Sequence, residues 1–159
     1  MTDFYTWVQY FGPSAKVNDY LDMALSHMLV SSKRDDRWVE THRFNIDAIL
    51  KLQSGGFNFS NRARVMFNTD NSEWLYRNRV RLTKPVKLFD RSFTPFVSNE
   101  FFFDLSSAED YNQNRASLGV AMGFFFNSRF TLAYMARGRK AKGKWSNTNV
   151  LETALGISF

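Results

Sequence analysis

Apolar and polar residues alternate one by one along most of this chain. In FNFSNRARVMFN, residues 57–68, Phe57 and Val65 take one set of alternate positions, while Arg62 and Arg64 take the other. A period of two is typical of a β-strand with one apolar and one polar face, and no helical stripe of comparable length competes with it. The pattern predicts nine strands, at residues 3–12, 19–32, 37–53, 57–68, 73–83, 97–105, 112–126, 129–139 and 150–159.

The segments between these strands have the composition of turns. They include SGG, NTDNS, KLFDRS, SSAEDY and KAKGKWSN, and the Gly55-Gly56 pair suits a tight two-residue hairpin. No linker, repeat or second domain interrupts the series, so residues 1–159 are predicted to form one domain. The expected fold is all-β: an antiparallel up-and-down meander whose strands exceed the usual length of about 5 or 6 residues.

Composition narrows the choice of protein class. The chain has 159 residues, of which 17% are aromatic, and its formal net charge of +6 suits an anionic partner. Cysteine is absent, which excludes disulfides, thiolate metal sites and thiol catalysis. No run approaches the roughly 20 apolar residues of a membrane-spanning helix. The opening MTDFYTWVQYF lacks the pattern of a signal peptide, so we expect either a mature or trimmed chain or a protein that stays inside the cell.

Two kinds of barrel share this alternation. A soluble barrel turns its apolar face inward, whereas an outer-membrane barrel turns it to lipid and keeps the charges inside. The charges at the strand centres are mostly arginine, which forms the fixed carboxylate pairs of a crowded interior, while lysine lies mostly in the breaks. Aromatic residues gather at strand ends, where membrane girdles would lie. They are Trp38, Trp74, Tyr76, Phe89, Phe93, Tyr111 and Trp145.

These features favour a transmembrane β-barrel with a polar lumen. The residues expected to line that lumen are Arg62, Arg64, Arg77, Arg79, Arg81, Glu100, Asp104, Arg115, Arg129, Arg137 and Glu152.

The last strand, VLETALGISF, alternates up to Phe159. Bacterial outer-membrane barrels resemble one another in ending on an aromatic residue, which the assembly machinery reads. Their last strand pairs with the first, so that no edge stays unsatisfied in lipid. Single-chain bacterial barrels have even numbers of strands. We therefore expect eight strands if residues 1–18 lie outside the wall, or ten if residues 37–53 are divided.

From about Trp38 onward, the sequence resembles a bacterial family filed as domain of unknown function 2490 (DUF2490). The resemblance lies in the segments EWLYRNRVRL, VSNEFFFDL and NQNRASLGV, and the opening DFYTWVQY is also similar. Members of this family are regarded as outer-membrane β-barrels without an assigned activity, so the resemblance implies fold and location rather than a reaction. The matching residues are Trp74, Arg77, Asn78, Arg79, Asn99, Glu100, Phe101, Asn114, Arg115, Leu118, Gly119, Tyr134 and Met135.

The arginine-rich face has two interpretations. One is an anion-selective pore built from arginine rings, and the other is a structural network in which Glu100 and Glu152 each accept from several arginines. An eight-stranded barrel leaves little room beyond its side chains, which favours the network. If a pore exists, its constriction is expected at Arg77, Arg79, Arg81, Arg115 and Glu100.

The sequence gives little support for catalysis, metal binding or nucleic-acid binding. His27 and His42 sit in no metal-ligand cluster or recognisable triad, so we expect ordinary strand histidines, no catalysis, and no metal or cofactor. The basic segment Arg137–Trp145 either contacts lipopolysaccharide phosphates or is a solvated loop. Nucleic-acid binding is not expected, because the other arginines would face the lumen rather than a common groove.

The sequence therefore predicts a protein of the bacterial outer membrane that has a structural role or passes small anions. Its expected partners are the lipid bilayer, lipopolysaccharide, the barrel-assembly machinery and, if the lumen is open, small anions. Two alternatives stay open: a soluble barrel that binds a hydrophobic ligand, and a small lipid-modifying enzyme of the outer membrane.

Overall fold

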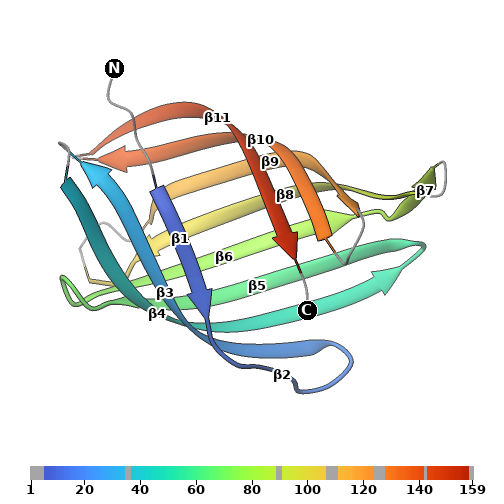
Figure 1. The fold of residues 1–159 in the computed structure, drawn as a ribbon, viewed down its shortest axis with the longest axis horizontal. Coiled ribbons are helices and arrows are strands. Elements are labelled where there is room, and N and C mark those ends of the chain that lie inside the picture. The colour runs from blue at the N-terminus through green and yellow to red at the C-terminus, as the bar shows by residue number, and fades with distance from the viewer. Residues whose placement is uncertain are drawn as a thin grey trace.

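Most of the described chain is β-strand. In this computed structural model the described residues are 6–34, 37–88, 91–106, 111–123, 128–141 and 143–157. They form one antiparallel sheet (Figure 1). The strands are β1 (Thr6–Phe11), β2 (Ser14–Lys16), β3 (Leu21–Arg34), β4 (Arg37–Ser54), β5 (Phe57–Asn68), β6 (Glu73–Thr83), β7 (Val86–Leu88), β8 (Arg91–Asp104), β9 (Tyr111–Gly123), β10 (Ser128–Ala141) and β11 (Lys144–Ile157). No helix in these ranges is long and apolar enough to cross a membrane.

Strands that are neighbours in the chain are neighbours in the sheet. The hydrogen-bonded path is β1-β3-β4-β5-β6-β8-β9-β10-β11, while β2 pairs with the start of β3 and β7 with the start of β8. The predicted all-β antiparallel meander is thus confirmed. Residues Arg37–Ser54 form one undivided strand, and β1 pairs with β3 along its full length. The path of the described residues contains nine strands, and the eight or ten expected in a closed wall stay a prediction.

Two strands are longer than the alternation predicts. β8 begins at Arg91 and β11 at Lys144, each several residues before the predicted start. Pro95 is of a residue type that strands disfavour, and Asn147 is polar at an apolar position of the alternation, yet both lie opposite residues of a neighbouring strand. Pairing along a sheet edge that already exists overrides weak local strand preference.

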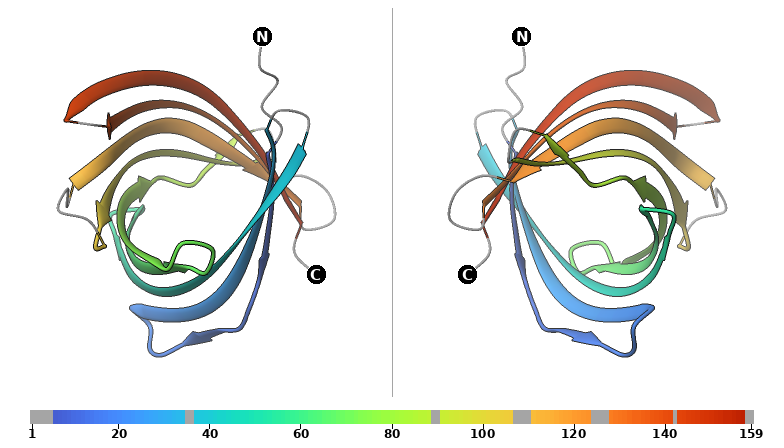
Figure 2. Two further views of the ribbon diagram at one scale, coloured as in Figure 1. Left: turned by 90° about the vertical axis from the view of Figure 1, so that its left-hand side faces the viewer. Right: turned by 90° about the vertical axis from the view of Figure 1, so that its right-hand side faces the viewer.

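The sheet is strongly curled into a half-barrel, with β1 and β11 at its two edges (Figure 2). β1 and β11 run in the same direction (Figure 1), because an antiparallel path of nine strands returns to its starting direction. The start of β1 and the end of β11 therefore lie at opposite ends of the strands. Among the described residues, no strand pairing joins β1 to β11.

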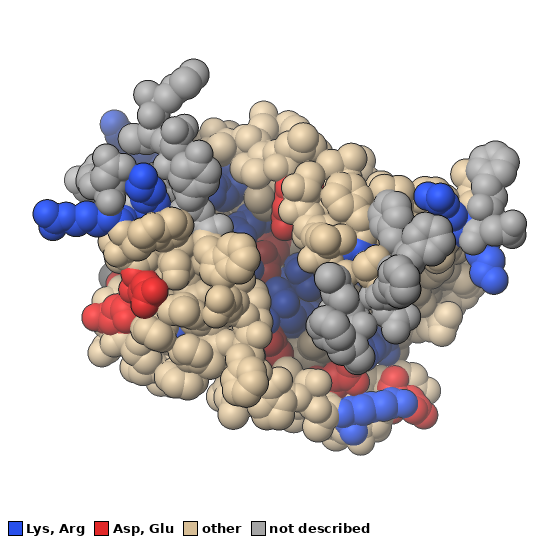
Figure 3. Space-filling model, viewed as in Figure 1, with Lys and Arg blue, Asp and Glu red and all other residues tan. Residues whose placement is uncertain are grey.

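The curl places charged residues inside and apolar residues outside. On the concave face Arg64 and Glu100 are 6% and 7% exposed, whereas on the convex face Leu118 and Leu151 are 66% and 71% exposed. Figure 3 shows a mostly uncharged outer surface, with charged atoms visible in a hollow between β1 and β11. Water-soluble domains bury the opposite set of residues. Of the two arrangements that the alternation allows, the structure has the one with charges inside.

The connection between β4 and β5 is a two-residue turn. Gly55 and Gly56 have φ angles of +56° and +76°, and Ser54 pairs with Phe57 beside them. A type I′ turn requires positive φ at both central residues, and glycine adopts this conformation without strain. The tight hairpin predicted at this glycine pair is confirmed.

Gly119 makes room for an aromatic ring inside the half-barrel. A Cβ atom at this position would lie 2.7 Å from Cζ of Phe96 and 2.5 Å from the backbone oxygen of Leu132. Phe96 stands opposite Gly119 in the β8–β9 ladder, and its side chain is buried. The absence of a side chain at Gly119 therefore leaves the space that the Phe96 ring occupies.

We expect Gly119→Ala to lower the free energy of unfolding by about 1–3 kcal/mol, because the added methyl group has to displace Phe96 or the β10 backbone. Gly123→Ala on the same strand is the matched control, since a Cβ there meets no described heavy atom within 4 Å. Urea unfolding of both variants, refolded under the same conditions, measures the difference. Equal stability of the two variants would contradict the close packing at Gly119.

Candidate functional site

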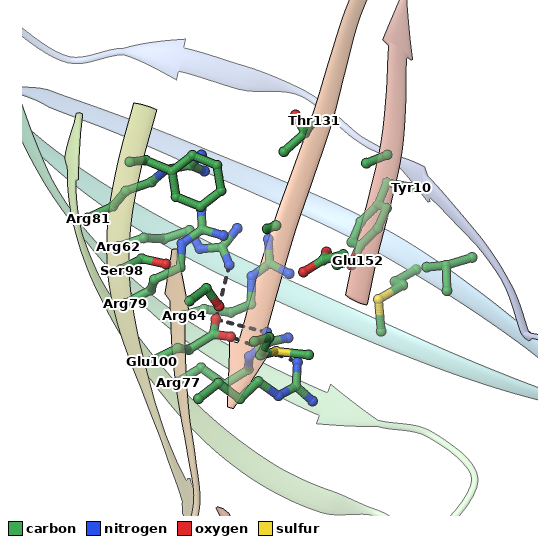
Figure 4. Close-up of a pocket in the computed structure, with 18 of the residues that line it drawn as sticks. Tyr10, Arg62, Arg64, Arg77, Arg79, Arg81, Ser98, Glu100, Thr131 and Glu152 are labelled. Atoms are coloured by element: carbon green, nitrogen blue, oxygen red, sulfur yellow. Dashed lines mark hydrogen bonds and ion pairs between the residues drawn. The ribbon is translucent and has the colours of Figure 1, made fainter. Parts of the chain in front are cut away.

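The concave side of the half-barrel encloses a cavity of about 820 Å³ (Figure 4). Every strand of the sheet path contributes side chains to its lining, from β1 to β11. The charged part of the lining consists of seven arginines and two glutamates. They are Arg43, Arg62, Arg64, Arg77, Arg79, Arg81, Arg115, Glu100 and Glu152.

Strand alternation and register bring the arginines together. Arg77, Arg79 and Arg81 follow one another at every second position of β6, so their side chains leave the same face of the strand. Across the β5–β6 ladder Arg62 lies opposite Arg79, and Arg64 lies opposite Arg77. Directly opposed like charges destabilise a sheet. The arrangement therefore requires anionic groups close by.

Glu100 pairs with three of these arginines. Its Oε1 atom accepts hydrogen bonds from Nη2 of Arg77 at 2.8 Å and from Nη2 of Arg62 at 3.3 Å. Its Oε2 atom lies 3.9 Å from Nη1 of Arg115. The Glu100 side chain is only 9% exposed. One buried carboxylate on β8 thus joins arginines of β5, β6 and β9.

A second buried carboxylate comes from β4. Asp47 accepts two hydrogen bonds from Arg64, at 2.6 Å from Nε and 2.7 Å from Nη2. It also lies 3.9 Å from Nε of Arg62. Two-point contacts between a guanidinium and a carboxylate are among the strongest hydrogen-bonded pairs in proteins. Both arginines of β5 are therefore compensated by residues of the sheet itself.

Three arginines of the cavity have no carboxylate partner in the described part of the chain. No Asp or Glu oxygen described there lies within 4 Å of Arg43, Arg79 or Arg81. The Nε atoms of Arg43 and Arg81, like that of the Glu100-paired Arg77, are buried without a hydrogen-bond partner among those residues. Buried charge is costly unless it is paired. This part of the cavity is therefore able to accept an anion.

Phenylalanine rings position several of the guanidinium groups. The Cζ atoms of Arg77 and Arg115 each lie 4.5 Å from the centre of the Phe102 ring, and Cζ of Arg81 lies 3.7 Å from the centre of the Phe96 ring. Cation–π contacts of this kind stabilise arginine and restrict its rotation. The charged groups are therefore held in place by the sheet before any ligand binds.

The structure places eight of the predicted lumen residues around this cavity. They are Arg62, Arg64, Arg77, Arg79, Arg81, Glu100, Arg115 and Glu152. Glu152 makes no ion pair within 4 Å among the described residues, although several arginines were expected to donate to it.

The other predicted lumen residues, Asp104, Arg129 and Arg137, are not part of the cavity lining. Asp104 and Arg129 lie at the ends of their strands, whereas Arg137 lies opposite the cavity residue Arg115 in the β9–β10 ladder. Asp104 instead accepts a hydrogen bond from the backbone N–H of Ser106 at 2.9 Å. Phe159 lies outside the described residues, so its role in assembly stays a prediction.

The prediction from sequence misses two charged residues of the interior, Arg43 and Asp47. It considers only the apolar face of residues 37–53. The same alternation places Arg43, Asn45 and Asp47 on the opposite face, and Asn45 is fully buried at 0% exposure. The signal was therefore present in the polar positions of this strand.

The two histidines contact each other away from the cavity. Nε2 of His27 lies 3.1 Å from Nδ1 of His42, and the stacked rings are 5.2 Å apart. They alternate with the cavity residues Met28 and Arg43, so they face the convex side. No group of three or more His, Cys, Asp and Glu that could hold a metal occurs in the described ranges. The expected absence of catalysis stays a prediction.

Comparison with known proteins identifies a family. The model of a family described as "Protein of unknown function (DUF2490)" matches residues 1–148. No curated protein matches the chain. The matched range contains all the arginines of the cavity, and Glu100 with them.

We expect Glu100→Gln to lower the free energy of unfolding by about 3–5 kcal/mol, because Arg77 and Arg115 lose their carboxylate partner and Arg62 keeps only Asp47. Glu152→Gln is the matched control: it makes the same change at an exposed residue of the same cavity, and we expect a change within about 0.5 kcal/mol. Urea unfolding followed by tryptophan fluorescence compares the two. If Glu100→Gln costs no more than Glu152→Gln, the Glu100 network does not stabilise the interior.

Proposed function

The chain belongs to the DUF2490 family, and we propose that it is a bacterial outer-membrane β-barrel that binds small anions in its arginine-lined interior and lets them pass. The observation that carries the proposal is an apolar outer face around a cavity in which seven arginines meet two glutamates. A membrane barrel keeps polar side chains inside and apolar ones toward lipid. Rings of arginine in such an interior attract anions.

Large apolar side chains at the middle of strands β9, β10 and β11 support a lipid-facing surface. Leu118, Tyr134 and Leu151 lie side by side on β9, β10 and β11, and each is more than half exposed. Contiguous exposed apolar surface is unfavourable in water and marks a membrane or partner contact. Contact with lipid chains would explain the exposed apolar surface along the whole convex face.

A row of aromatic rings near one end of the strands supports the same placement. The ring centroids are 5.9 Å apart for Tyr76 and Phe103, 5.6 Å for Phe103 and Tyr111, and 5.4 Å for Tyr111 and Trp145. The row runs from β6 to β11. Tyrosine and tryptophan are enriched where a membrane meets water. We propose that this row is one interfacial girdle of the barrel.

The two edges of the half-barrel approach each other across the interior. Val8 and Tyr10 of β1 line the same cavity as Glu152 and Ala154 of β11. In lipid, unpaired backbone edges are strongly unfavourable, and we propose that the wall closes between these strands. If β1 and β11 pair directly, they form a parallel pair. If one further strand lies between them, that strand is antiparallel to both and the wall has ten strands.

The charge of the interior favours anion binding over the alternatives. A purely structural network would compensate its arginines, whereas Arg43, Arg79 and Arg81 have no carboxylate partner among the described residues. A wholly apolar ligand, as in the soluble-barrel alternative, would leave these charges desolvated. His27 and His42 face away from the cavity, so they do not support a lipid-modifying enzyme.

Lipopolysaccharide is the proposed partner at the end of the barrel that carries the aromatic row. Arg139, Lys144 and Trp145 are exposed around the turn that joins β10 and β11. Basic side chains beside an interfacial tryptophan suit a layer of phosphates at the headgroup level.

We expect Leu118→Arg to lower the free energy of unfolding in phospholipid vesicles by about 2–4 kcal/mol, because this residue lies at the centre of β9. Leu105→Arg, just beyond the end of β8, is the matched control and should cost about 0–1 kcal/mol. The two leucines are 66% and 59% exposed, so in water both changes would be nearly neutral. Urea unfolding from vesicles measures both, and small equal effects would argue against a lipid-facing surface.

In planar bilayers we expect the protein to conduct chloride in preference to potassium, because unpaired arginines line its interior. The double variant Arg79→Gln/Arg81→Gln should lose most of this preference. Arg139→Gln/Lys144→Gln removes two positive charges outside the cavity and is the control. The reversal potential in a potassium chloride gradient measures selectivity. A protein that does not conduct, or that conducts both ions equally, overturns the proposed function.

A further inference from the structure

The cavity has one charged wall and one apolar wall. Strands β4 to β9 supply all of its arginines. In Figure 4, Arg79 and Arg81 lie on one side and Tyr10 lies on the other. The apolar wall comes from β1, β3 and β10, while β11 adds Glu152 beside Tyr10 (Figure 4) and the Tyr10 ring lies 5.8 Å from Cζ of Arg64. The residues of the apolar wall are Val8, Tyr10, Met28, Val30, Ala133 and Met135.

We propose that this cavity binds an amphipathic monoanion, a linear aliphatic carboxylate such as a medium-chain fatty acid. The carboxylate lies at Arg79 and Arg81, and the aliphatic chain lies along the apolar wall. This assignment rests on the proposed function, since it requires an interior that admits anions.

Arg79 and Arg81 are the best placed of the arginines to hold a carboxylate. Glu100 stands opposite Arg79 in the β6–β8 ladder, but its carboxylate is hydrogen-bonded to Arg77 and Arg62 instead. Nε of Arg81 is buried without a hydrogen-bond partner among the described residues. A guanidinium offers donors in a planar fork that matches a carboxylate. The pair is therefore positively charged, with donors left to satisfy.

Hydroxyl groups complete the polar side of this subsite. Ser98 lies opposite Arg81 in the β6–β8 ladder, and Ser117 lies opposite Ser98 in the β8–β9 ladder. Both side chains line the cavity. The Phe96 ring, which stacks against Arg81, limits the positions that its guanidinium group can take. The charged donors and the hydroxyls thus meet on one small area of the wall.

The apolar wall explains why an inorganic anion alone is not the best ligand. Val8 and Tyr10 are 42% and 58% exposed and line the same cavity as the arginines. Replacing the water at such a surface with an aliphatic chain favours binding. Each buried methylene group raises the affinity about three- to fourfold. The volume of about 820 Å³ lies within the range of roughly 300–1,000 Å³ that is typical of sites for organic ligands.

The test is a titration of the protein in lipid nanodiscs with acetate, butyrate, hexanoate and octanoate, followed by calorimetry. We expect affinity to rise about three- to fourfold with each added methylene, and octanol, which lacks the charge, to bind far more weakly than octanoate. Empty nanodiscs give the part of the signal that comes from partition into lipid.

Two pairs of variants separate the head-group and chain contacts. Arg81→Gln should weaken octanoate at least tenfold, with Arg91→Gln, at an exposed residue outside the cavity lining, as its control. Val30→Thr should reduce the ratio of octanoate to butyrate affinity, with Val97→Thr on the convex face as its control. Met28→Gln is the second variant of the apolar wall, in case one of the two fails to fold.

Each outcome decides one of the two proposals. Affinity that does not change with chain length, together with a loss in Arg81→Gln, overturns the amphipathic ligand but leaves an anion-binding interior. Octanol that binds as tightly as octanoate overturns the head-group assignment. If no carboxylate binds and chloride is not conducted, the proposed function itself fails.

Discussion

The pairing of partly buried guanidinium groups with the buried carboxylate of Glu100 is the interaction on which the interior depends. Arg62, Arg77 and Arg115 come from three different strands, and each is attracted to the same carboxylate on a fourth. A buried charge without a partner costs several kcal/mol. Separating or shifting these strands would break the ion pairs and leave such charges unpaired. The contact that neutralises the charge therefore also fixes how β5, β6, β8 and β9 lie relative to one another.

Strand register couples this interior to the outer surface. Arg79 and Arg81 point into the cavity while Val80 and Leu82, their neighbours on β6, take the opposite face. A shift of one residue would exchange the two sets completely. The apolar convex face and the charged concave face are thus two consequences of one ladder of hydrogen bonds. The proposed lipid-facing surface and the proposed anion-binding interior therefore depend on the same strand register.

The interior is uneven in charge and in polarity. Near Glu100 and Asp47 the arginines are paired, whereas Arg79 and Arg81 keep donors without carboxylate partners in the described chain. Rigid aromatic contacts such as Phe96 with Arg81 hold the guanidinium groups in position, which lowers the entropy lost when a ligand binds. One part of the interior is therefore compensated in charge, and the other part carries guanidinium groups without carboxylate partners among the described residues.

The alternation by itself determined the all-β meander, the hairpin at the glycine pair and most of the cavity arginines, because a period of two is a local property of the chain. Only the tertiary structure decided that Glu100 pairs with Arg77 rather than Arg79, that Asp47 joins the interior, and that β8 and β11 extend beyond the alternation. These outcomes depend on the register between strands and on the curl of the sheet. Both are set by contacts between segments far apart in the chain, which no local pattern records.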